Sequence, residues 1–592
     1  MSNNKEFPIR GNTLINPFAA LCVILVLSTL ITSHLLIYRS LTPVFLYLVI
    51  LGFASFYCGT RVLFSSKILM PAFGIVHWAF LLWGCYIIFD AGAIHRDVNL
   101  WTLYLLSLVI LFFLSTFLLR TANTGLFIGV AILAVAESSV CFLQLSGALK
   151  SLNELFPITG SWDNPNVTAM FLAMSLPAGF ICQNNHAGAI RRLGWIAFVV
   201  VVCTVLILGC RTAFIGAIVI IVMAYAKRWR AILLQSKSWI RILCVVIAAS
   251  IVIAGSMFAY KAKQASADGR LLIWKISWQM IREKPFFGYG YGRFEKYYNL
   301  SQSEYFKNNQ GTPGELKNAG FVHMAYNEFL QNGVEGGLIG LLLLILVFYS
   351  LLRSGYGRSE YRMGYAGVIA FLLMSVFNFS IQAVPAMVLF VLYTAVLTNQ
   401  KKTESGLSLK IGGLAGLLSG LGLLLYAAQG FYYQRLNQQA RQEARGHHLD
   451  EAIATIDLIG DHLANDEDFW ITAGNISLEE KDFSKAVVDF NWARSLTSDP
   501  FMYSQLALSY EKMQDYAAAE EILETVRYIE PTRLTPKYEL MNLYLAKADT
   551  TRAVAIAQQI VDSDPKVASE KAAFYKLKAA DLLRSLKETK ND

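Results

Sequence analysis

The sequence predicts an all-α protein in two parts, a polytopic membrane helix bundle followed by a soluble α-solenoid. Long apolar segments recur from about residue 15 to about residue 427, many near the roughly 20 residues that cross a bilayer as a helix. The chain is 55% hydrophobic and only 16% charged, which is typical of an integral membrane protein. Residues 468–565 instead hold an internal repeat with a period in the low thirties, which indicates stacked helix pairs.

Thirteen membrane spans are expected, and the basic residues of the short loops orient them. With the N-terminus inside, basic loops such as "NNHAGAIRR" and "NQKKTESGLSLK" fall in the cytoplasm, as the positive-inside rule requires. The same count places the long loop, residues 260–335, and the tail from Gln429 outside. The expected spans are residues 15–38, 41–63, 68–89, 99–119, 125–147, 167–183, 193–210, 212–226, 238–259, 336–352, 362–381, 383–399 and 408–427.

Charge divides the chain at the same point, between residues 1–427 and 428–592. The tail from Gln429 carries 19 Lys+Arg against 27 Asp+Glu, whereas the rest has a net charge of +17 spread over loops, so the basic excess does not indicate nucleic acid. No CxxC occurs, and the eight cysteines lie in or beside apolar segments, so neither a zinc site nor a disulfide framework is supported.

One intramembrane charge stands out. Arg211, in "LILGCRTAFIG", lies at an outside turn between two apolar runs with no acidic neighbour in sequence. It is either an interfacial arginine that reaches the lipid headgroups or an anion site facing a cavity, because intramembrane charge is costly and usually has a partner.

The long loop is expected to begin with an amphipathic helix on the outer leaflet. Asp268 is a plausible N-cap, Arg270 lies in the first turn, and Pro285 ends the helix. Apolar residues recur at i, i+3, i+7 and i+10, namely Leu271, Trp274, Trp278 and Ile281. The following "GYGYG" lacks the strand and helix of a dinucleotide fingerprint, so it predicts a tight turn.

The stretch "FVHMAYNEFLQNGVEGGLIG" closes the loop, with polar side chains four residues apart. On a helix they would form one winding stripe: His323, Asn327, Gln331 and Glu335. His323 and Glu335 favour function, whereas Asn327 and Gln331 fit a water-facing helix end equally well. Gly336 and Gly340 form a small-xxx-small pair that permits close packing on a neighbouring helix.

A second polar segment, "GSWDNPNVTAMFLAMSLP", enters the span at residue 167. Its "DNPN" reads as a turn followed by a helix start, so Asn164 and Asn166 either bind sugar or cap the helix, and capping is expected for one of them.

The tail resembles tetratricopeptide repeats. Three units begin "DFWITAGNISLEE", "FMYSQLALSYEK" and "LTPKYELMNLYL", each a predicted helix pair that ends near a proline. "LDEAIATIDLIGDHL", residues 449–463, looks like a degenerate leading repeat. Such stacks bury a continuous core and leave a concave face for binding, and the tail shows no catalytic set.

Over roughly residues 125–400 the chain resembles the O-antigen ligase superfamily of bacterial membrane glycosyltransferases. Four segments carry the resemblance: "GSWDNPNVTAMFLAMSLP", "CRTAFIG", "GRLLIWKISWQMIREKPFFGYGYGRFEKYY" and "HMAYNEFLQNGVEGGLIG". The resemblance implies a donor glycan on undecaprenyl diphosphate and inverting transfer on the periplasmic side of the inner membrane, with neither a cofactor nor a metal. The odd number of spans places the tail on the same side, so the tail is expected to be periplasmic. The extra final span and the repeats depart from the simplest ligases, which leaves the acceptor open between lipid A-core and protein.

The implied chemistry assigns roles to the candidate residues. Arg211 and Arg270 would clamp the leaving diphosphate, because guanidinium forks match phosphate oxygens. His323 would accept the acceptor's proton or, when protonated, bind the diphosphate. Glu335 would orient the stripe, and Lys275 and Arg293 are further phosphate candidates.

Three other hypotheses stay open on sequence alone. A polymerase of the same family would join two lipid-linked repeats. A multispan transporter or a membrane scaffold presenting the repeats would need neither His323 nor Arg211. A metal-dependent transferase would rest only on Asp90 and Asp97 in "FDAGAIHRDV".

Overall fold

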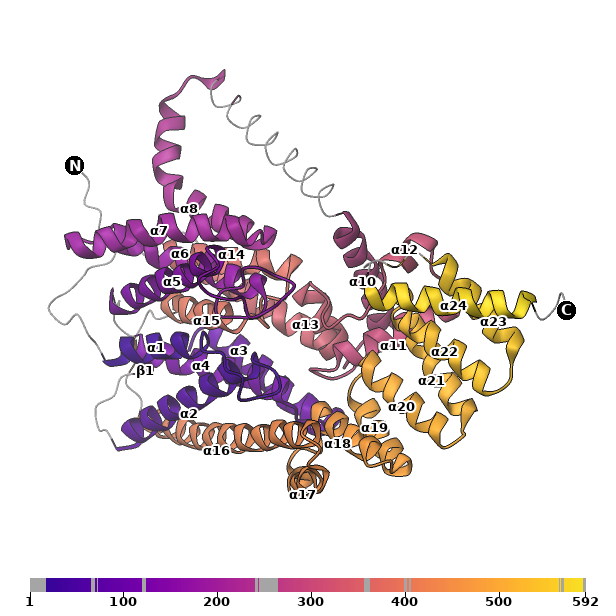
Figure 1. Cartoon of the computed structure of the whole chain (residues 1–592). Helices are drawn as coiled ribbons and strands as arrows, with labels where there is room; N and C mark the ends of the chain where they lie inside the picture. Colours follow the sequence, from indigo (N-terminus) through magenta and orange to yellow (C-terminus); the bar gives the residue numbers. More distant parts are fainter. Residues whose placement is uncertain are drawn as a thin grey trace. The chain divides into compact units, whose positions relative to one another are not determined.

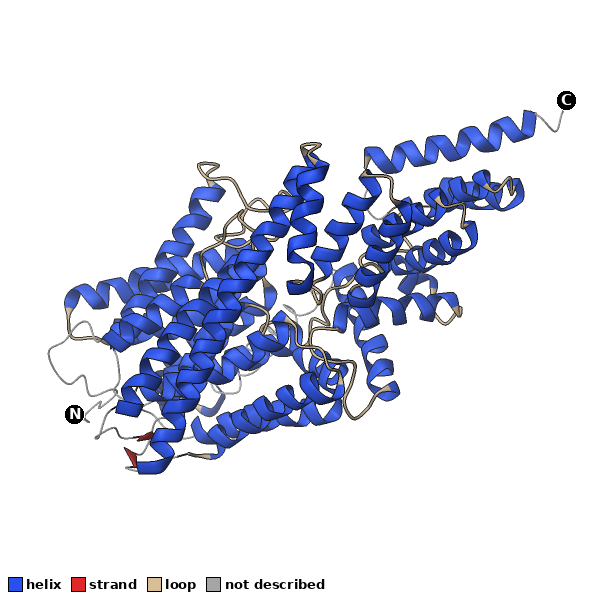
Figure 2. Ribbon diagram, turned by 90° about the horizontal axis from the view of Figure 1, so that it is seen from below, coloured by secondary structure: helices blue, strands red, loops and turns tan. Residues whose placement is uncertain are grey.

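The computed structural model describes residues 17–64, 70–71, 73–119, 124–239, 243, 264–355, 362–398, 402–403, 406–563, 565 and 569–588. The chain divides into two compact units. The membrane unit consists of residues 1–252, 326–332 and 338–435, and the loop–repeat unit of residues 253–325, 333–337 and 436–592. The expected all-α class is confirmed (Figure 2), with one two-residue antiparallel pair, β1 (Met70–Pro71) and β2 (Lys402–Thr403), beside the helices.

Helices form the membrane unit because its apolar segments satisfy their backbone hydrogen bonds internally. Within the described residues, eight helices are long and apolar enough to cross a bilayer. The predicted span 238–259 lies almost wholly outside the described residues, and α1 is much shorter than the predicted 15–38. The helices are α1 (Pro17–Ser28), α2 (Leu41–Phe64), α3 (Ile75–Phe89), the π-helix η1 (Asp90–Ile94), α4 (Leu100–Leu118), α5 (Thr124–Leu145), α6 (Pro165–Gln183), α7 (Gly188–Leu208), α8 (Arg211–Gln235), α13 (Glu328–Gly355), α14 (Arg362–Phe377), α15 (Val384–Thr398) and α16 (Gly406–Arg445).

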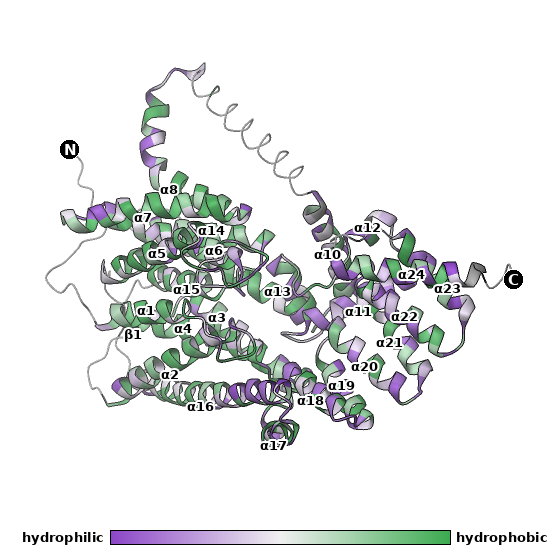
Figure 3. Cartoon of the chain, viewed as in Figure 1, coloured by the Kyte–Doolittle hydropathy of each residue, from purple (hydrophilic) through white to green (hydrophobic). Residues whose placement is uncertain are grey.

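The centre of this unit is α6, of which 89% of the apolar window is buried. It packs against α5, α7, α8, α14 and α15. Figure 3 shows these helices as predominantly hydrophobic. The polar loop before α6 therefore leads directly into the core of the membrane unit.

Glycines let α2 and α16 approach closely. A Cβ on Gly59 would lie 2.4 Å from the Leu417 nitrogen, and one on Gly420 would lie 2.4 Å from the Phe56 nitrogen. Small residues at such contacts allow helix backbones to pack without a side chain between them. Figure 3 shows α16 changing from hydrophobic to hydrophilic along its length, and the boundary between the two units falls within it, after Arg435.

The loop–repeat unit combines the long loop with the C-terminal helices. The loop contains α10 (Gln264–Glu283), α11 (Phe294–Lys307) and α12 (Pro313–Asn318). α10 ends before Pro285 as expected, but it begins by Gln264, so Asp268 lies inside the helix and the prediction of Asp268 as its N-cap was wrong. Of the predicted apolar set, Ile281 is buried, whereas Leu271 and Trp278 are half exposed. The other buried residues of α10 include Leu272, Ile276 and Met280.

The C-terminal helices pair as the repeats predicted (Figure 1): α18 (Glu467–Glu479) with α19 (Phe483–Leu496), α20 (Pro500–Lys512) with α21 (Tyr516–Ile529), and α22 (Thr535–Ala546) with α23 (Thr550–Asp562). α17 (Leu449–Ile459), the 3₁₀ turn η3 (Gly460–His462) and α24 (Glu570–Glu588) flank them. We call residues 468–565 the repeat region. Small residues allow its helices to approach: a Cβ on Gly474 would lie 2.6 Å from the Phe490 ring.

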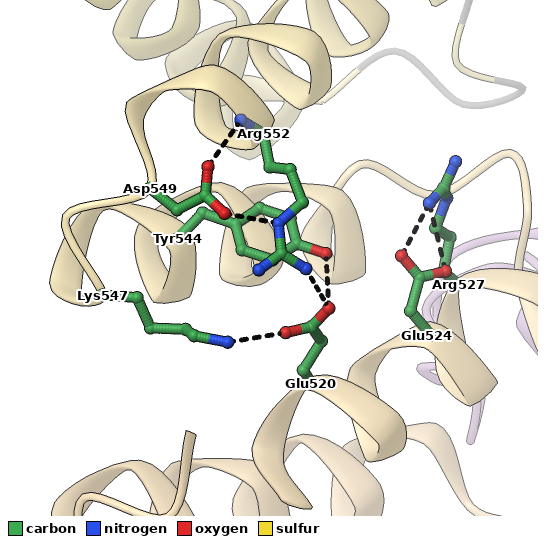
Figure 4. A network of polar contacts seen from close by, with 7 residues as sticks. All are labelled: Glu520, Glu524, Arg527, Tyr544, Lys547, Asp549 and Arg552. Carbon is green, nitrogen blue, oxygen red and sulfur yellow. Dashed lines mark hydrogen bonds and ion pairs between the residues drawn. The ribbon is translucent and has the colours of Figure 1, made fainter. Parts of the chain in front are cut away.

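Polar contacts join the second and third helix pairs (Figure 4). Glu520 on α21 accepts hydrogen bonds from Lys547 at 2.9 Å, Tyr544 at 3.2 Å and Arg552 at 2.5 Å, and Asp549 also binds Arg552. Because these side chains are partly exposed, their ion pairs add little stability. The buried apolar core between the helices, which includes Leu506, Leu523 and Leu540, contributes most of it.

Candidate functional site

Arg211 is the first residue of α8, and Cys210 is its N-cap. The Arg211 side chain is partly buried, and its Nη2 is a buried atom that has no hydrogen-bond partner among the residues that the structure describes. The first turn of a helix also presents N–H groups that lack partners within the helix and carries a partial positive charge. Two sources of positive potential therefore coincide here, and both favour the binding of an anion.

The turn between α14 and α15 lies against the start of α8. Asn378 Nδ2 donates to Thr212 Oγ1 at 2.7 Å, and Asn378 is buried. Three residues later, Ile381 N–H donates to Glu328 Oε1 at 2.7 Å, and the Ile381 carbonyl accepts from the Tyr104 hydroxyl at 2.7 Å. The starts of α8 and α13 thus meet this turn at the same end of the membrane unit, with α4 beside it.

The predicted helical stripe is wrong at its beginning. α13 starts at Glu328, so His323 lies in the preceding loop, exposed, with its ring 4.7 Å from that of Phe321. Asn327 is a cap: its Oδ1 accepts from the N–H groups of Phe329 and Leu330, both at 3.0 Å. Asn residues favour such caps over helix interiors because their side chains replace missing backbone partners. The periodicity alone could not locate this boundary.

Gln331 and Glu335 do lie within α13, four residues apart, and both are buried. α13 bends immediately after them at Gly337, whose φ of 63° and ψ of −167° are not helical. Gln331 belongs to the membrane unit and Glu335 to the loop–repeat unit. The predicted stripe is therefore reduced to two buried side chains just before a bend.

The predicted tight turn at "GYGYG" is confirmed, since Gly288, Gly290 and Gly292 all have positive φ. It holds the bend of α13: Tyr289 N–H donates to the Val334 carbonyl and Gly290 N–H to the Glu335 carbonyl, both at 2.9 Å. The bend frees these carbonyls from the helix, and the turn supplies the donors. We call residues 288–292 the glycine turn.

Gly336 and Gly337 allow the glycine turn and the residues just before it to lie close to the bend of α13. A Cβ on Gly336 would lie 2.5 Å from the Tyr291 hydroxyl, and one on Gly337 would lie 2.2 Å from the Phe286 carbonyl oxygen. The tight contact at Gly336 is with Tyr291 of the long loop rather than with a neighbouring helix, which was the predicted partner.

Asn164 caps α6, because its side chain accepts from Asn166 N–H at 3.0 Å, so the expectation that one of the two asparagines is a cap is confirmed. The loop before it is anchored by α5. Glu137 Oε1 accepts from Ser161 N–H at 2.7 Å, and Gln144 Oε1 accepts from the N–H groups of Thr159 and Gly160 at 2.9 and 2.8 Å.

Asp163, in the same loop, is partly buried. Burial raises the pKa of Asp163, and the positive charge of Arg39 opposes this shift. Asn166, the second residue of α6, is also partly buried.

The remaining candidates, Lys275, Arg293 and Arg270, belong to the loop–repeat unit. Lys275 Nζ donates to Glu315 Oε1 and to the Tyr305 hydroxyl, both at 2.7 Å, which ties α10 to α12. Arg293 is the N-cap of α11 and donates from Nη1 to the Leu496 carbonyl at 3.1 Å. Arg270 is partly buried on α10. For Lys275 and Arg293 the structure therefore shows structural contacts, and their phosphate-binding role stays a prediction.

Sequence reasoning missed Glu328 and Tyr326. Glu328 is 3% exposed and directly follows Asn327; a carboxylate beside a potential N-cap at the mouth of a span was the available signal. Tyr326 has a φ of 52°, which is rare for a bulky residue, and its ring packs edge-on against Phe379. No local pattern in the sequence marks that conformation.

A cavity of about 260 Å³ opens in the loop–repeat unit between α17, α18 and α19. Aromatic and charged side chains line it, including Trp470, Asp457, Lys485 and Asp489. Asp489 is buried and accepts from Ser477 Oγ at 2.9 Å; burial raises its pKa, and the Ser477 hydrogen bond and Lys485 oppose the rise. Asp489 thus has an internal partner already.

Part of the chain is similar to known proteins. Residues 196–345 match the family model described as O-Antigen ligase. A protein of Rickettsia felis described as "Putative polysaccharide ligase" is 36% identical over 95 residues, which are 16% of this chain and 22% of that protein. A Rickettsia conorii protein of the same description is 32% identical over 125 residues, 21% of this chain and 29% of that protein. The chain thus spans less than a third of the length of either relative.

The crystal structure of yeast Tom70 matches with a TM-score of 0.24 and 11% identity, covering 70% of this chain and 92% of Tom70, and it carries no argument about fold or function. The residues that match the O-antigen ligase family model include Arg211, Arg270, His323 and Glu335.

Proposed function

We propose that the chain is a membrane glycosyltransferase of the O-antigen ligase type, which moves a glycan from undecaprenyl diphosphate to an acceptor hydroxyl at the periplasmic face of the bacterial inner membrane. The position of Arg211 is the observation that carries the proposal. It combines a buried guanidinium nitrogen that has no partner among the described residues with the N-terminus of α8, inside the region that matches the family model.

In the proposed reaction an acceptor oxygen attacks the anomeric carbon, the bond between that carbon and the phosphate oxygen breaks, and undecaprenyl diphosphate leaves with the electron pair. Negative charge grows on the departing diphosphate, so fixed donors aimed at it stabilise the transition state most. Arg211 and the α8 N-terminus supply such donors, and Arg270 is the second proposed cation.

The proposed proton acceptor is His323. The His323 side chain is exposed, and a neutral imidazole nitrogen can accept the acceptor's proton as the new bond forms. Attack from the face opposite the leaving group inverts the anomeric configuration, and no step requires a metal. Glu335, Gln331, Asn327, Asn164 and Asn166 are the proposed surroundings of the substrates.

The test compares Arg211→Ala and Arg211→Lys with Arg192→Ala, an exposed arginine at the far end of α7. Each full-length variant is expressed in a strain lacking the gene, and the lipid-linked and transferred glycans are quantified. Arg211→Ala should reduce transfer about 10²- to 10³-fold, as removal of one oxyanion donor does, and lipid-linked glycan should accumulate. Arg211→Lys keeps the charge without the fork and should fall between.

Normal transfer by a well-expressed Arg211→Ala variant would refute the proposal and favour a transporter or a scaffold. The length of the accumulated glycan separates two versions of the reaction. Full-length glycan left on the lipid indicates a ligase acting on lipid A-core or protein, whereas single repeat units indicate a polymerase.

A further inference from the structure

The long loop contacts the repeat region through side chains of α11 that lie about 200 residues away in sequence. Two cations at its start cap the end of α19: Arg293 Nη1 donates to the Leu496 carbonyl at 3.1 Å and Lys296 Nζ to the Ser495 carbonyl at 2.5 Å. The last carbonyls of a helix lack partners and carry a partial negative charge, so these two cations stabilise the C-terminus of α19.

Glu295 binds the residues that follow α19. Its Oε2 accepts from Thr497 Oγ1 at 2.9 Å, and its Oε1 accepts from the backbone N–H of Ser498 at 3.1 Å and from Ser498 Oγ at 2.5 Å. Thr497 and Ser498 are both buried. Through these three hydrogen bonds, the Glu295 carboxyl group binds two consecutive residues of the repeat region.

A second link lies one and a half to two turns further along α11, at the end of α21. Gln302 Nε2 donates to the carbonyls of Ile529 and Gly320 at 2.9 and 3.0 Å, and Ser303 Oγ donates to the Thr525 carbonyl at 3.0 Å. Gln302 is fully buried. The side chains of α11 therefore hold the C-terminal turns of α19 and α21, the second helices of two successive pairs. Any loss of these contacts would leave buried polar groups unsatisfied.

α11 begins directly after the glycine turn, residues 288–292, which donates to the carbonyls of Val334 and Glu335 at the bend of α13. Residues 333–337 belong to the loop–repeat unit, whereas the residues on either side of them in α13 belong to the membrane unit. A continuous series of contacts thus runs from the repeats through α11 and the glycine turn to the bend.

From these contacts we propose that the repeat region is a positioning element of the transferase, and that Glu295 and Gln302 are positioning residues for glycan transfer. By fixing α11 the repeats hold the glycine turn, and the turn holds the bend of α13 just after Gln331 and Glu335. The proposal rests on the proposed function. It assigns the repeats a role that is independent of which acceptor is used.

The experiment uses the purified full-length chain and membranes from a strain lacking the gene, which contain lipid-linked glycan and its native acceptor. The rate of donor consumption is measured as lipid-linked glycan extracted from the same strain is added. Glu295→Ala should lower kcat at least about tenfold while KM for the lipid-linked glycan changes less than about twofold, because an interaction that only positions the reacting parts is lost.

Two matched variants separate positioning from general damage. Glu295→Gln keeps one oxygen that can accept from Ser498 and should recover at least half of kcat. Glu304→Ala removes an exposed glutamate from the same helix and should behave as the wild type. Hydrogen exchange of residues 286–292 and 333–337 should accelerate in Glu295→Ala, while exchange in α5 and α6 stays unchanged.

If Glu295→Ala is poorly folded, Ser303→Ala decides the matter with the same readouts, because it removes one hydrogen bond and leaves a good helix former. Equal kcat in Glu295→Ala and Glu304→Ala would overturn the proposal, as would a rise in KM alone, which would indicate donor binding by the repeats. Wild-type protein that consumes no lipid-linked glycan would refute the proposed function, whereas the exchange result would still report separately on the series of contacts.

Discussion

Replacing Glu328 with alanine should loosen the turn between α14 and α15. Its Oε1 accepts the Ile381 N–H at 2.7 Å, and both residues are 3% exposed. A hydrogen bond to a charged group contributes about 1.5–3 kcal/mol, and alanine leaves the buried N–H without that partner. A loss of about 2 kcal/mol in the free energy of local opening makes the open state about 30 times more populated at 25 °C.

Hydrogen exchange of the peptide covering residues 378–383, in the full-length chain, measures this opening. Exchange at Ile381 should be about 30 times faster in Glu328→Ala and only about five times faster in Glu328→Gln, whose amide oxygen still accepts a neutral hydrogen bond. Glu154→Ala, which removes an exposed glutamate of the same unit, should leave exchange unchanged. Exchange within threefold of the wild type in Glu328→Ala would refute the reasoning.

Two further perturbations test the loop–repeat unit. Gly337→Ala places a Cβ 2.2 Å from the Phe286 carbonyl oxygen at a φ of 63°, so chymotrypsin should cleave after the exposed Phe286 at least about tenfold faster than in the wild type or in Gly314→Ala, whose Cβ meets open space. Burial raises the pKa of Glu315, but hydrogen bonds from Lys275, Thr312 and Tyr305 outweigh this effect and lower the pKa to about 2. The contribution of Glu315 to stability is therefore present above about pH 4.5 and is lost as the pH falls towards 2. Pepsin cleavage beside the exposed Leu316 should therefore increase in the wild type as the pH falls from 4.5 to 2. In Lys275→Met, cleavage should already be high at pH 4.5. Identical pH profiles of the two proteins would contradict a stabilising role for the Lys275–Glu315 ion pair.

Local sequence predicted the class of nearly every element. An apolar segment of about 20 residues, enough to cross a bilayer as a helix, has few alternatives to helical structure in lipid. The helix pairs of the repeat region follow from a sequence period that is visible along the chain. Caps such as Asn164 and turns such as "GYGYG" were also predictable, because they depend on a few neighbouring residues and on the permissive backbone of glycine.

The candidate site was predictable in its residue types but not in its arrangement. Arg211 stood out because an isolated charge among apolar residues is costly anywhere in the chain. The stripe failed because a four-residue spacing carries no information about where α13 begins, and Asn327 ends the helical pattern by capping it. The sequence around Lys275 and Arg293 did not indicate that Lys275 donates to Glu315 and Arg293 to the Leu496 carbonyl.

The sequence by itself determined that this protein is an all-α membrane chain with a soluble repeat region, because hydrophobic length and periodicity are local quantities. Only the tertiary structure decided that Glu328 accepts a hydrogen bond from Ile381 N–H in the turn between α14 and α15. It also decided that the glycine turn binds the bend of α13 and that α11 lies against the repeat region. Each of these contacts joins residues between about 45 and 230 positions apart. Such pairings depend on which buried donors and acceptors meet when the chain packs, and no pattern within a single segment specifies them.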